Sequence, residues 1–477
     1  MNFKNIQNLD NYTGTILIPV FETTAKSLVP IEYHGISVSS NVFYGKKDTH
    51  YMIDKYNCIH IFIGLGKKLD YKSLKTIFRR ISSKQKEIFS QNVALIIPDN
   101  FDDNQVEASI SGLLLGTYDL GHFKKKEKHA FLDESFELDI ISKDDFSESV
   151  KKGMKIAEAQ LEVLKLVDLP PNVVTPKYLS SWAAKSGEKY GFSTEIFGLE
   201  KCAELGLEAF LSVGKGSDKE LQFVIMNYIP KNATSKTKHI GLVGKGVTFD
   251  TGGLNIKTVG MLHMKCDMAG GAAVFGAMQL ISSLKLDVKV TAIVACCENS
   301  VDSKSFLPSD VIRSYSGHSI EIIDTDAEGR LILADGLSYL IKNFNPNIIV
   351  DIATLTGSSV GTFGYECAAL FTNNEELCKT LQKCGDEIGE RLWQLPLWDC
   401  YNTDIESEIA DVKNYSGKPV AGAISAAKFL EFFTNDHKSW VHLDVAGVAF
   451  GDDEFAKTKH ATAYGVHLLT KFVENLI

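Results

Sequence analysis

The sequence lacks any hydrophobic run long enough to cross a membrane. Stretches such as Ile59–Leu65 and Thr291–Cys297 have the length of buried strands, whereas a membrane helix needs roughly 18 or more apolar residues. The N-terminal segment also lacks a basic region followed by an uninterrupted apolar run, so we expect no secretory signal. These absences predict a cytosolic protein that makes no use of a membrane.

The sequence also lacks cysteines at metal-binding or disulfide-type spacing and an excess of basic charge. The nine cysteines form no C-x-x-C motif, which favours reduced, mostly buried thiols over a disulfide framework or a structural zinc site. The formal net charge is -10, and this acidic balance argues against general affinity for nucleic acid. We interpret the one lysine-rich segment, Lys124–Lys128, as a solvated loop rather than a phosphate-binding element.

Two common catalytic motifs are absent. No H-E-x-x-H is present, which excludes that zinc-peptidase design, and Gly244-Lys-Gly lacks the full G-x-x-x-x-G-K-[ST] spacing of a phosphate-binding loop. His263 lies close to a segment rich in charged residues, but we interpret it as a structural or exposed histidine rather than a ligand.

The length of 477 residues predicts two or three domains. Residues 1–144 alternate short apolar strands with charged helical segments, among them strands at 15–20, 59–65 and 93–97 and a basic helix at 71–88, and predict a small α/β domain. Residues 145–169 show helical periodicity and predict a connector helix that ends before Pro170 and Pro171. Residues 170–477 predict a larger α/β domain, whose mainly parallel central sheet is covered by helices.

The continuous apolar runs of this larger domain are typical of strands buried on both faces. We expect these strands at residues 223–228, 240–243, 290–296, 320–323, 348–353 and 440–445, and helices at 272–284, 331–341 and 423–433.

Charged residues follow two of the predicted strands. Lys245 and Asp250 come after the strand at 240–243, and Asp326 and Glu328 come after the strand at 320–323. Ligands of open α/β sheets bind beyond the carboxyl ends of the strands. We therefore expect these side chains to converge there, with a helix beginning near Gly329.

Four carboxylates in these segments, those of Asp250, Asp267, Asp326 and Glu328, carry a summed formal charge of -4. Two divalent ions would neutralise them, and oxygen-rich ligation favours Mg2+, Mn2+ or Zn2+. The alternative is that these are turn and capping residues, because Asp-Thr-Gly-Gly is good turn chemistry and Asp324 or Thr325 could cap the following helix. Spacing alone leaves both interpretations open.

A motif resemblance favours the metal interpretation. Asp324-Thr-Asp-Ala-Glu-Gly-Arg-Leu331 resembles Asn-Thr-Asp-Ala-Glu-Gly-Arg-Leu, the signature of the leucine aminopeptidase family of dimetal cytosol aminopeptidases. The resemblance covers residues 145–477, and two departures are Asp324 in place of Asn and Leu307-Pro-Ser-Asp310 in place of basic-Pro-Gly-Asp. Other segments similar to the family are 243–257, 264–273, 171–176, 353–357 and 442–447.

The resemblance implies a ligand set for two metal ions. Asp250 and Glu328 would bridge the ions, Asp326 would complete one site, and Lys245 and Asp267 would complete the other. Lys245 would bind as a neutral amine, so its pKa would have to fall well below the reference of about 10.4, which an adjacent dication makes feasible. The ions implied are Mn2+ or Zn2+, with Mg2+ as a further candidate.

The resemblance also implies catalytic and substrate-binding roles. Lys257 would stabilise the oxyanion of the tetrahedral intermediate, and Arg330, together with Leu355, would hold a bicarbonate ion that acts as general base. The pocket for the first side chain of the substrate would be formed by Met264, Thr354, Gly357, Ala446 and Ala449, whose largely apolar character suits leucine or methionine.

The function implied is that of a leucyl aminopeptidase, a metal-dependent hydrolase that removes N-terminal leucine or other apolar residues from short peptides. The family also implies a homohexamer. Three alternatives stay open: a cysteinyl-glycine dipeptidase, a DNA-binding architectural or regulatory protein of the same fold, and a binding protein that has lost catalysis.

Overall fold

The computed structural model describes residues 2–23, 30–33, 35–89, 92–125, 129–133 and 135–477. The chain forms two compact units, Met1–Glu158 and Ala159–Ile477. The division falls inside helix α3 (Ser147–Asp168), which ends before Pro170 and Pro171, as the prolines predict. Of the lysine-rich segment 124–128, residues 124 and 125 are exposed and 126–128 lie outside the described residues.

The N-terminal unit is built on a six-stranded sheet with the order β1-β8-β7-β2-β6-β5. All neighbours pair in parallel except β6 and β5. The predicted helix at 71–88 is wrong at its end, because Gln85 leaves the helical conformation and a separate 3-10 turn follows at Lys86–Ile88. The elements are β1 (Asn2–Asn5), β2 (Gly14–Phe21), β3 (Ile31–Tyr33), β4 (Ile36–Val38), β5 (His50–Lys55), β6 (Cys58–Gly66), α1 (Tyr71–Lys84), β7 (Asn92–Ile96), α2 (Asp103–Leu115) and β8 (Glu137–Ile141).

The C-terminal unit contains an eight-stranded sheet with the order β17-β16-β19-β15-β11-β12-β10-β9. Its centre, β19-β15-β11-β12, is parallel. Strands β16 and β10 flank this centre in antiparallel orientation, and β9 pairs antiparallel with β10. The predicted α/β class is confirmed. The main-sheet strands are β9 (Ser193–Phe197), β10 (Gln222–Tyr228), β11 (His239–Asp250), β12 (Lys289–Asn299), β15 (Ile348–Ala353), β16 (Ala368–Thr372), β17 (Leu392–Gln394) and β19 (Trp440–Asp444).

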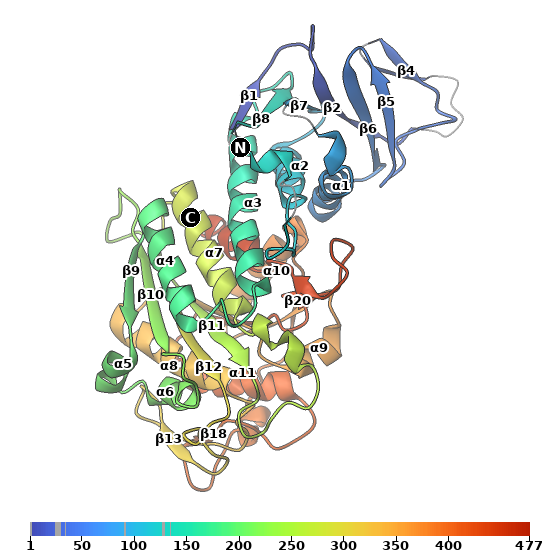
Figure 1. Ribbon diagram of the computed structural model, residues 1–477. Helices are drawn as coiled ribbons and strands as arrows, with labels where there is room; N and C mark the ends of the chain where they lie inside the picture. Colours follow the sequence, from blue (N-terminus) through green and yellow to red (C-terminus); the bar gives the residue numbers. More distant parts are fainter. Residues whose placement is uncertain (1, 24–29, 34, 90–91, 126–128, 134) are drawn as a thin grey trace. The chain divides into compact units, whose positions relative to one another are not determined.

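Helices cover both faces of this sheet, and Figure 1 draws α4 and α7 on its near side and the fainter α8 behind it. The alternation of a strand explains the two faces: a Cβ on Gly244 would lie 2.6 Å from Gly271 of α7, whereas Gly336 of α8 packs on Val243. The helices are α4 (Pro176–Tyr190), α5 (Leu199–Leu205), α6 (Glu208–Gly214), α7 (Ala269–Leu284), α8 (Gly329–Phe344), α9 (Gly357–Phe363), α10 (Glu375–Ile388), α11 (Gly422–Phe432) and α12 (Val466–Glu474).

Two strand predictions need correction. Strand β11 continues to Asp250 instead of ending at residue 243, because β12 runs beside it over the same length and pairs Asp250 with Asn299. The strand predicted at 320–323 is β14 (Ser319–Glu321), and it belongs to a separate three-stranded sheet with β13 (Val311–Arg313) and β18 (Val412–Lys413). Two further short strands, β20 (Phe450–Gly451) and β21 (His460–Ala461), pair with each other.

In the described part of the chain, each helix is too short or too polar to cross a membrane.

Candidate metal centre

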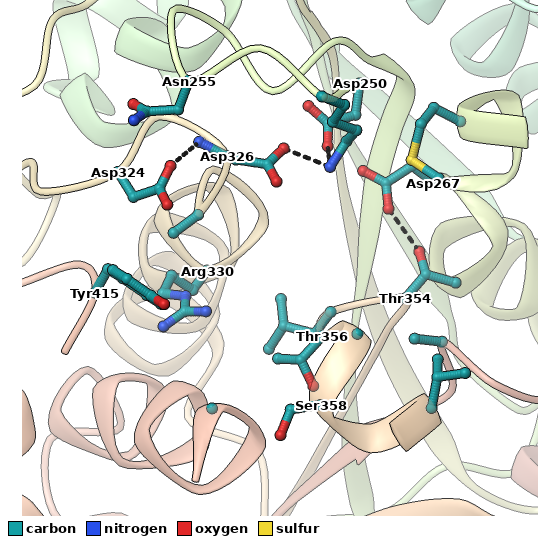
Figure 2. Close-up of a pocket in the computed structure, with 18 of the residues that line it drawn as sticks. Asp250, Asn255, Asp267, Asp324, Asp326, Arg330, Thr354, Thr356, Ser358 and Tyr415 are labelled. Carbon is teal, nitrogen blue, oxygen red and sulfur yellow. Dashed lines mark hydrogen bonds and ion pairs between the residues drawn. The ribbon is translucent and has the colours of Figure 1, made fainter. Parts of the chain in front are cut away.

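Three carboxylates converge at the end of β11. Asp250 is the last residue of that strand, and Asp326 and Glu328 lie in the turn just before α8, which begins at Gly329 as predicted. One oxygen from each of the three lies within 4.8 Å of the others. A fourth carboxylate, that of Asp267, enters at the end of the 3-10 helix η3 (Met261–Cys266), and Figure 2 shows it facing the same pocket as Asp250 and Asp326.

Two lysines share these carboxylates. The Nζ of Lys245 lies 2.9 Å from Asp267 Oδ2 and 2.8 Å from Glu328 Oε1. It also donates to the carbonyl of Thr354 at 3.0 Å. The Nζ of Lys257 lies 2.7 Å from Asp250 Oδ2 and contacts Asp326 Oδ1. Each lysine therefore joins carboxylates that come from different parts of the chain.

Glycines allow the carboxylate-bearing segments to approach one another. Gly252 and Gly253 adopt φ values of 87° and 63°, which favour glycine, and they turn the chain back immediately after Asp250. A Cβ on Gly329 would lie 2.6 Å from Cε and Nζ of Lys245. Because the ion pairs hold this lysine in place, any larger residue would displace it from the carboxylates.

A layer of neutral side chains fixes the carboxylates. Asn299 donates to Asp250 Oδ1 at 2.8 Å and to the carbonyl of Thr325 at 3.0 Å. The hydroxyl of Thr325 donates to the carbonyl of Gly252 at 2.7 Å and accepts from the backbone N–H of Asn255 at 2.8 Å. The segment after β11 and the turn before α8 are thus tied together by buried hydrogen bonds.

Burial, together with the crowding of negative charge, raises carboxylate pKa values at this site. Burial, and then the charges of Asp250 and Glu328, raise the pKa of Asp326 to about 7. Burial also raises the pKa of Asp267 well above its ordinary value. The pKa of Lys245 is pulled down by burial, but the surrounding carboxylates more than offset this and raise it overall. This protein environment alone therefore keeps Lys245 protonated, and a ligand role requires a metal ion to displace its proton.

One buried oxygen at this site, Oε2 of Glu328, accepts no hydrogen bond from the described residues. Oε1 of Glu328 and Oδ2 of Asp267 are contacted by Lys245 Nζ. Buried polar atoms are normally satisfied, and carboxylate oxygens are the ligand atoms that Mg2+, Mn2+ and Zn2+ prefer. The cluster of carboxylates and the unsatisfied oxygen of Glu328 fit divalent cations.

The carboxylates open into a pocket of about 820 Å³. Arg330 lines it from α8, beside Tyr415 (Figure 2). Its guanidinium is buried, and Nε has no hydrogen-bond partner among the described residues. Burial lowers the pKa of Arg330, while the nearby carboxylates of Glu328 and Asp324 oppose that shift. A planar cation with free donors in a pocket can bind a small planar anion.

Most of the predicted substrate residues line this same pocket, namely Met264, Thr354, Gly357 and Ala446, and so does Leu355, which was predicted to hold bicarbonate with Arg330. Ala449 is buried and, in the described structure, is not among the lining residues. His263 is partly buried and its ring contacts Phe450 at 5.8 Å between centroids, which agrees with a structural histidine.

The sequence did not reveal the asparagine side chains that hold the carboxylate cluster, nor the residues after β18 that line the pocket. Asn299 gave a weak signal, because it ends a buried strand beside Asp250. Asn414, Tyr415 and Lys418 gave none, since they follow a strand of two residues, β18, that periodicity cannot detect. Asp324 caps the turn rather than α8: it accepts from the backbone N–H of Asp326 at 2.8 Å.

Known sequences of the cytosol aminopeptidase family resemble this chain. The sequence model of the family described as the cytosol aminopeptidase family, catalytic domain, matches residues 163–470. A protein of Chloroherpeton thalassium named probable cytosol aminopeptidase is 38% identical over 437 residues, covering 87% of this chain and 85% of the relative. A protein of Clostridium perfringens with the same name is 37% identical, covering 82% and 81%.

Solved structures resemble the chain over nearly its whole length. The bottromycin maturation enzyme BotP in complex with Mn has a TM-score of 0.86 at 25% identity, covering 97% of this chain and 99% of that chain. A second BotP structure has a TM-score of 0.83 at 26% identity with the same coverage.

Proposed function

The chain belongs to the cytosol aminopeptidase family, and from that premise we propose that it is a metal-dependent aminopeptidase that removes the N-terminal residue from short peptides. The observation that carries this proposal is the convergence of Asp250, Asp326 and Glu328. Asp250 and Asp326 line a pocket together with Lys257 and Arg330. We assign catalysis to residues 170–477, the domain predicted from the sequence.

We assign the metal ligands by the motif positions. Asp250 and Glu328 would bridge two divalent ions, with Asp326 on one and with Lys245 and Asp267 on the other. Mn2+ and Zn2+ are the proposed ions, and the manganese named for the similar BotP structure supports the first. When bound, such a pair supplies a hydroxide nucleophile and polarises the scissile carbonyl. The unsatisfied Oε2 of Glu328 supports this assignment.

Lys257 is the proposed stabiliser of the oxyanion that develops during attack. Its Nζ contacts Asp250 and Asp326, and these contacts keep the ammonium group of Lys257 next to the carboxylates. Burial lowers the pKa of Lys257, but the carboxylates of Asp250, Glu328 and Asp326 raise it overall above its ordinary value. The ammonium therefore stays charged, as oxyanion stabilisation requires.

Arg330 and Leu355 are the proposed site for bicarbonate, which would serve as general base. Both residues line the pocket, and the unpartnered Nε of Arg330 supports anion binding. Two threonine hydroxyls at the pocket donate to carboxylates, that of Thr354 to Asp267 and that of Thr356 to Asp444. A neutral hydroxyl is too weak a base to take the proton of water, so neither replaces the bound anion in that role.

The first side chain of the substrate would bind beside Met264, Thr354, Gly357 and Ala446, which line the pocket. Their small or apolar surfaces support a preference for leucine and similar residues. A free α-amine on the substrate would complete the binding and limit cleavage to the first peptide bond. A homohexameric, cytosolic enzyme is proposed on the family resemblance.

A comparison of leucine amide with N-acetyl-leucine amide tests this proposal. The protein is stripped of metal with a chelator and then supplied with Mn2+ or Zn2+. We expect metal-dependent hydrolysis of the free-amine compound alone. Hydrolysis of neither compound by protein with bound metal would contradict the proposed activity, and stronger hydrolysis of cysteinyl-glycine than of leucine substrates would replace the leucyl preference.

A further inference from the structure

We propose that Asn414 is a positioning residue for the metal centre: its amide fixes the turn that presents Asp326 and couples this turn to the segment 415–419, which also lines the pocket. This inference rests on the proposed metal-dependent function. Asn414 is fully buried and follows directly on β18, outside every motif that the sequence resemblance covers.

The side chain of Asn414 makes four hydrogen bonds to the backbone of one turn. Its Oδ1 accepts from the N–H of Ile323 at 2.8 Å and from the N–H of Asp324 at 3.3 Å. Its Nδ2 donates to the carbonyl of Asp324 at 2.6 Å and to the carbonyl of Ala327 at 3.3 Å. These bonds hold the chain on both sides of Asp326.

The chemistry of the amide matches this task. Asparagine carries two donors and an acceptor with two lone pairs in one short, planar group, and here all of them are used. Aspartate has nearly the same shape, but its ionised carboxylate has no donor. An aspartate at position 414 would therefore place an oxygen against the carbonyls of Asp324 and Ala327.

The turn depends on such support because it is irregular. It lies between β14 and α8, and its internal bonds are those from the N–H of Asp326 to Asp324 Oδ1 at 2.8 Å and from the N–H of Ala327 to the carbonyl of Asp324 at 3.2 Å. Neither bond connects the turn to another element. Thr325 ties the turn to the segment after β11. Asn414 ties it to β14, since its own N–H donates to the carbonyl of Glu321 at 3.0 Å and its side chain spans the turn.

The residues that follow Asn414 form part of the wall of the pocket. Tyr415, Lys418 and Pro419 line it, and Lys418 is itself held by an ion pair of 2.5 Å to Asp404. One residue thus joins the wall to the turn that carries Asp326. Loss of the amide is expected to weaken metal binding and to raise KM for the substrate together.

The test is a calorimetric titration of chelator-stripped protein with Mn2+, comparing the wild type with Asn414→Asp. Residues that orient metal ligands typically contribute about 10–100-fold in affinity, so we expect at least about a tenfold weaker affinity at one of the two sites. KM for leucine amide should rise in the same variant. Binding of both ions within twofold of the wild type, by a variant with wild-type circular dichroism, would overturn the proposal.

Asp335→Asn is the matched control for general destabilisation. Asp335 is buried on the same helix α8 and accepts from the backbone N–H groups of Phe210 at 2.9 Å and Tyr315 at 2.7 Å, but it does not line the pocket as the structure describes it. This variant should lower the melting temperature and leave Mn2+ affinity unchanged. Equal weakening of Mn2+ binding in both variants would show that Asn414 acts only through general stability, and would overturn the inference.

A milder substitution, Asn414→Ser, serves if the aspartate variant does not fold. Serine keeps one donor and should weaken Mn2+ binding to an intermediate degree, and unchanged affinity would again overturn the inference. The titration requires no substrate. A wild type that binds Mn2+ but hydrolyses no peptide would refute the proposed function alone, whereas a wild type that binds no Mn2+ would refute both.

Discussion

The Nζ of Lys245 lies 2.8 Å from Oε1 of Glu328, and both side chains are buried. Buried charges are costly to desolvate, and their mutual attraction compensates only when the surrounding geometry is good. Here four carboxylates share two ammonium groups, so negative charge remains uncompensated. The centre is therefore suited to cations beyond those that the protein itself provides.

Replacement of Lys257 with methionine removes the ammonium group but keeps much of the side-chain volume. Loss of one group that stabilises an oxyanion typically lowers kcat by about 10²–10³-fold, and we expect a decrease of that size with little change in KM. Steady-state kinetics on leucine amide with saturating Mn2+ measures both constants.

Lys418→Met provides the control, because Lys418 also lines the pocket but pairs with Asp404. Its kcat should fall far less than that of the Lys257 variant. Equal kcat values for the wild type and Lys257→Met would show that position 257 has no electrostatic role in the transition state.

Replacement of Ala446 with leucine tests the proposed pocket for the first side chain. Ala446 lines the cavity, and its backbone N–H is held by Asp444 at 3.2 Å, so a larger side chain would occupy the space of the substrate. An apolar pocket discriminates between two substrates that differ by one methylene group by about 10–200-fold. We expect the ratio of kcat/KM for leucine amide over alanine amide to fall by a factor in that range.

The Ala446→Gly variant enlarges the same pocket and should not lower that ratio. If Ala446→Leu retains the wild-type ratio, the first side chain binds elsewhere.

His239 is expected to make the C-terminal unit sensitive to acid. Its Nε2 lies 2.8 Å from the hydroxyl of Thr291, which in turn donates to Asn227. Nε2 therefore carries the proton of a neutral ring. Burial, and then the charge of Lys289, lower the pKa of His239 to about 4.

The sign of the effect follows from this shift. Between about pH 6.5, the ordinary value, and pH 4 the unfolded chain takes up a proton that the folded chain does not. Stability is thus fully present above about pH 6.5 and falls as the pH decreases. We expect His239→Gln to remove about 1–2 kcal/mol of the stability difference between pH 7 and pH 5, measured from melting temperatures at the two values. The same pH dependence in His239→Gln and wild type would show that His239 does not titrate in this window.

The sequence predicts the larger elements of the C-terminal unit well, for a physical reason. Strand β15 occupies the residues expected, and helix α7 begins three residues earlier than expected, because continuous apolar runs and helical periodicity report burial directly. The full length of β11 could not be predicted in this way. Its last residues, from Gly244 to Asp250, are strand because β12 hydrogen-bonds alongside them, not because they are apolar.

The residues of the carboxylate cluster were visible in the sequence, but the groups that hold them were not. Asp250 and Glu328 stand in recognisable motifs, whereas Asn414 is brought to the turn by β18, through pairing across about 90 residues of sequence. A single amide in a loop carries no periodic or compositional signal. Only the folded chain shows that its hydrogen bonds end beside Asp326.

The most direct test of the account is to count the metal ions that activity requires. Chelator-stripped protein is supplied with Mn2+ in steps, and bound metal and leucine amide hydrolysis are measured on the same samples, with Glu328→Gln in parallel. The account predicts no activity without metal, full activity at two ions per chain, and both metal binding and activity severely reduced in Glu328→Gln. Full activity in metal-free protein, or wild-type metal binding by Glu328→Gln, would contradict it.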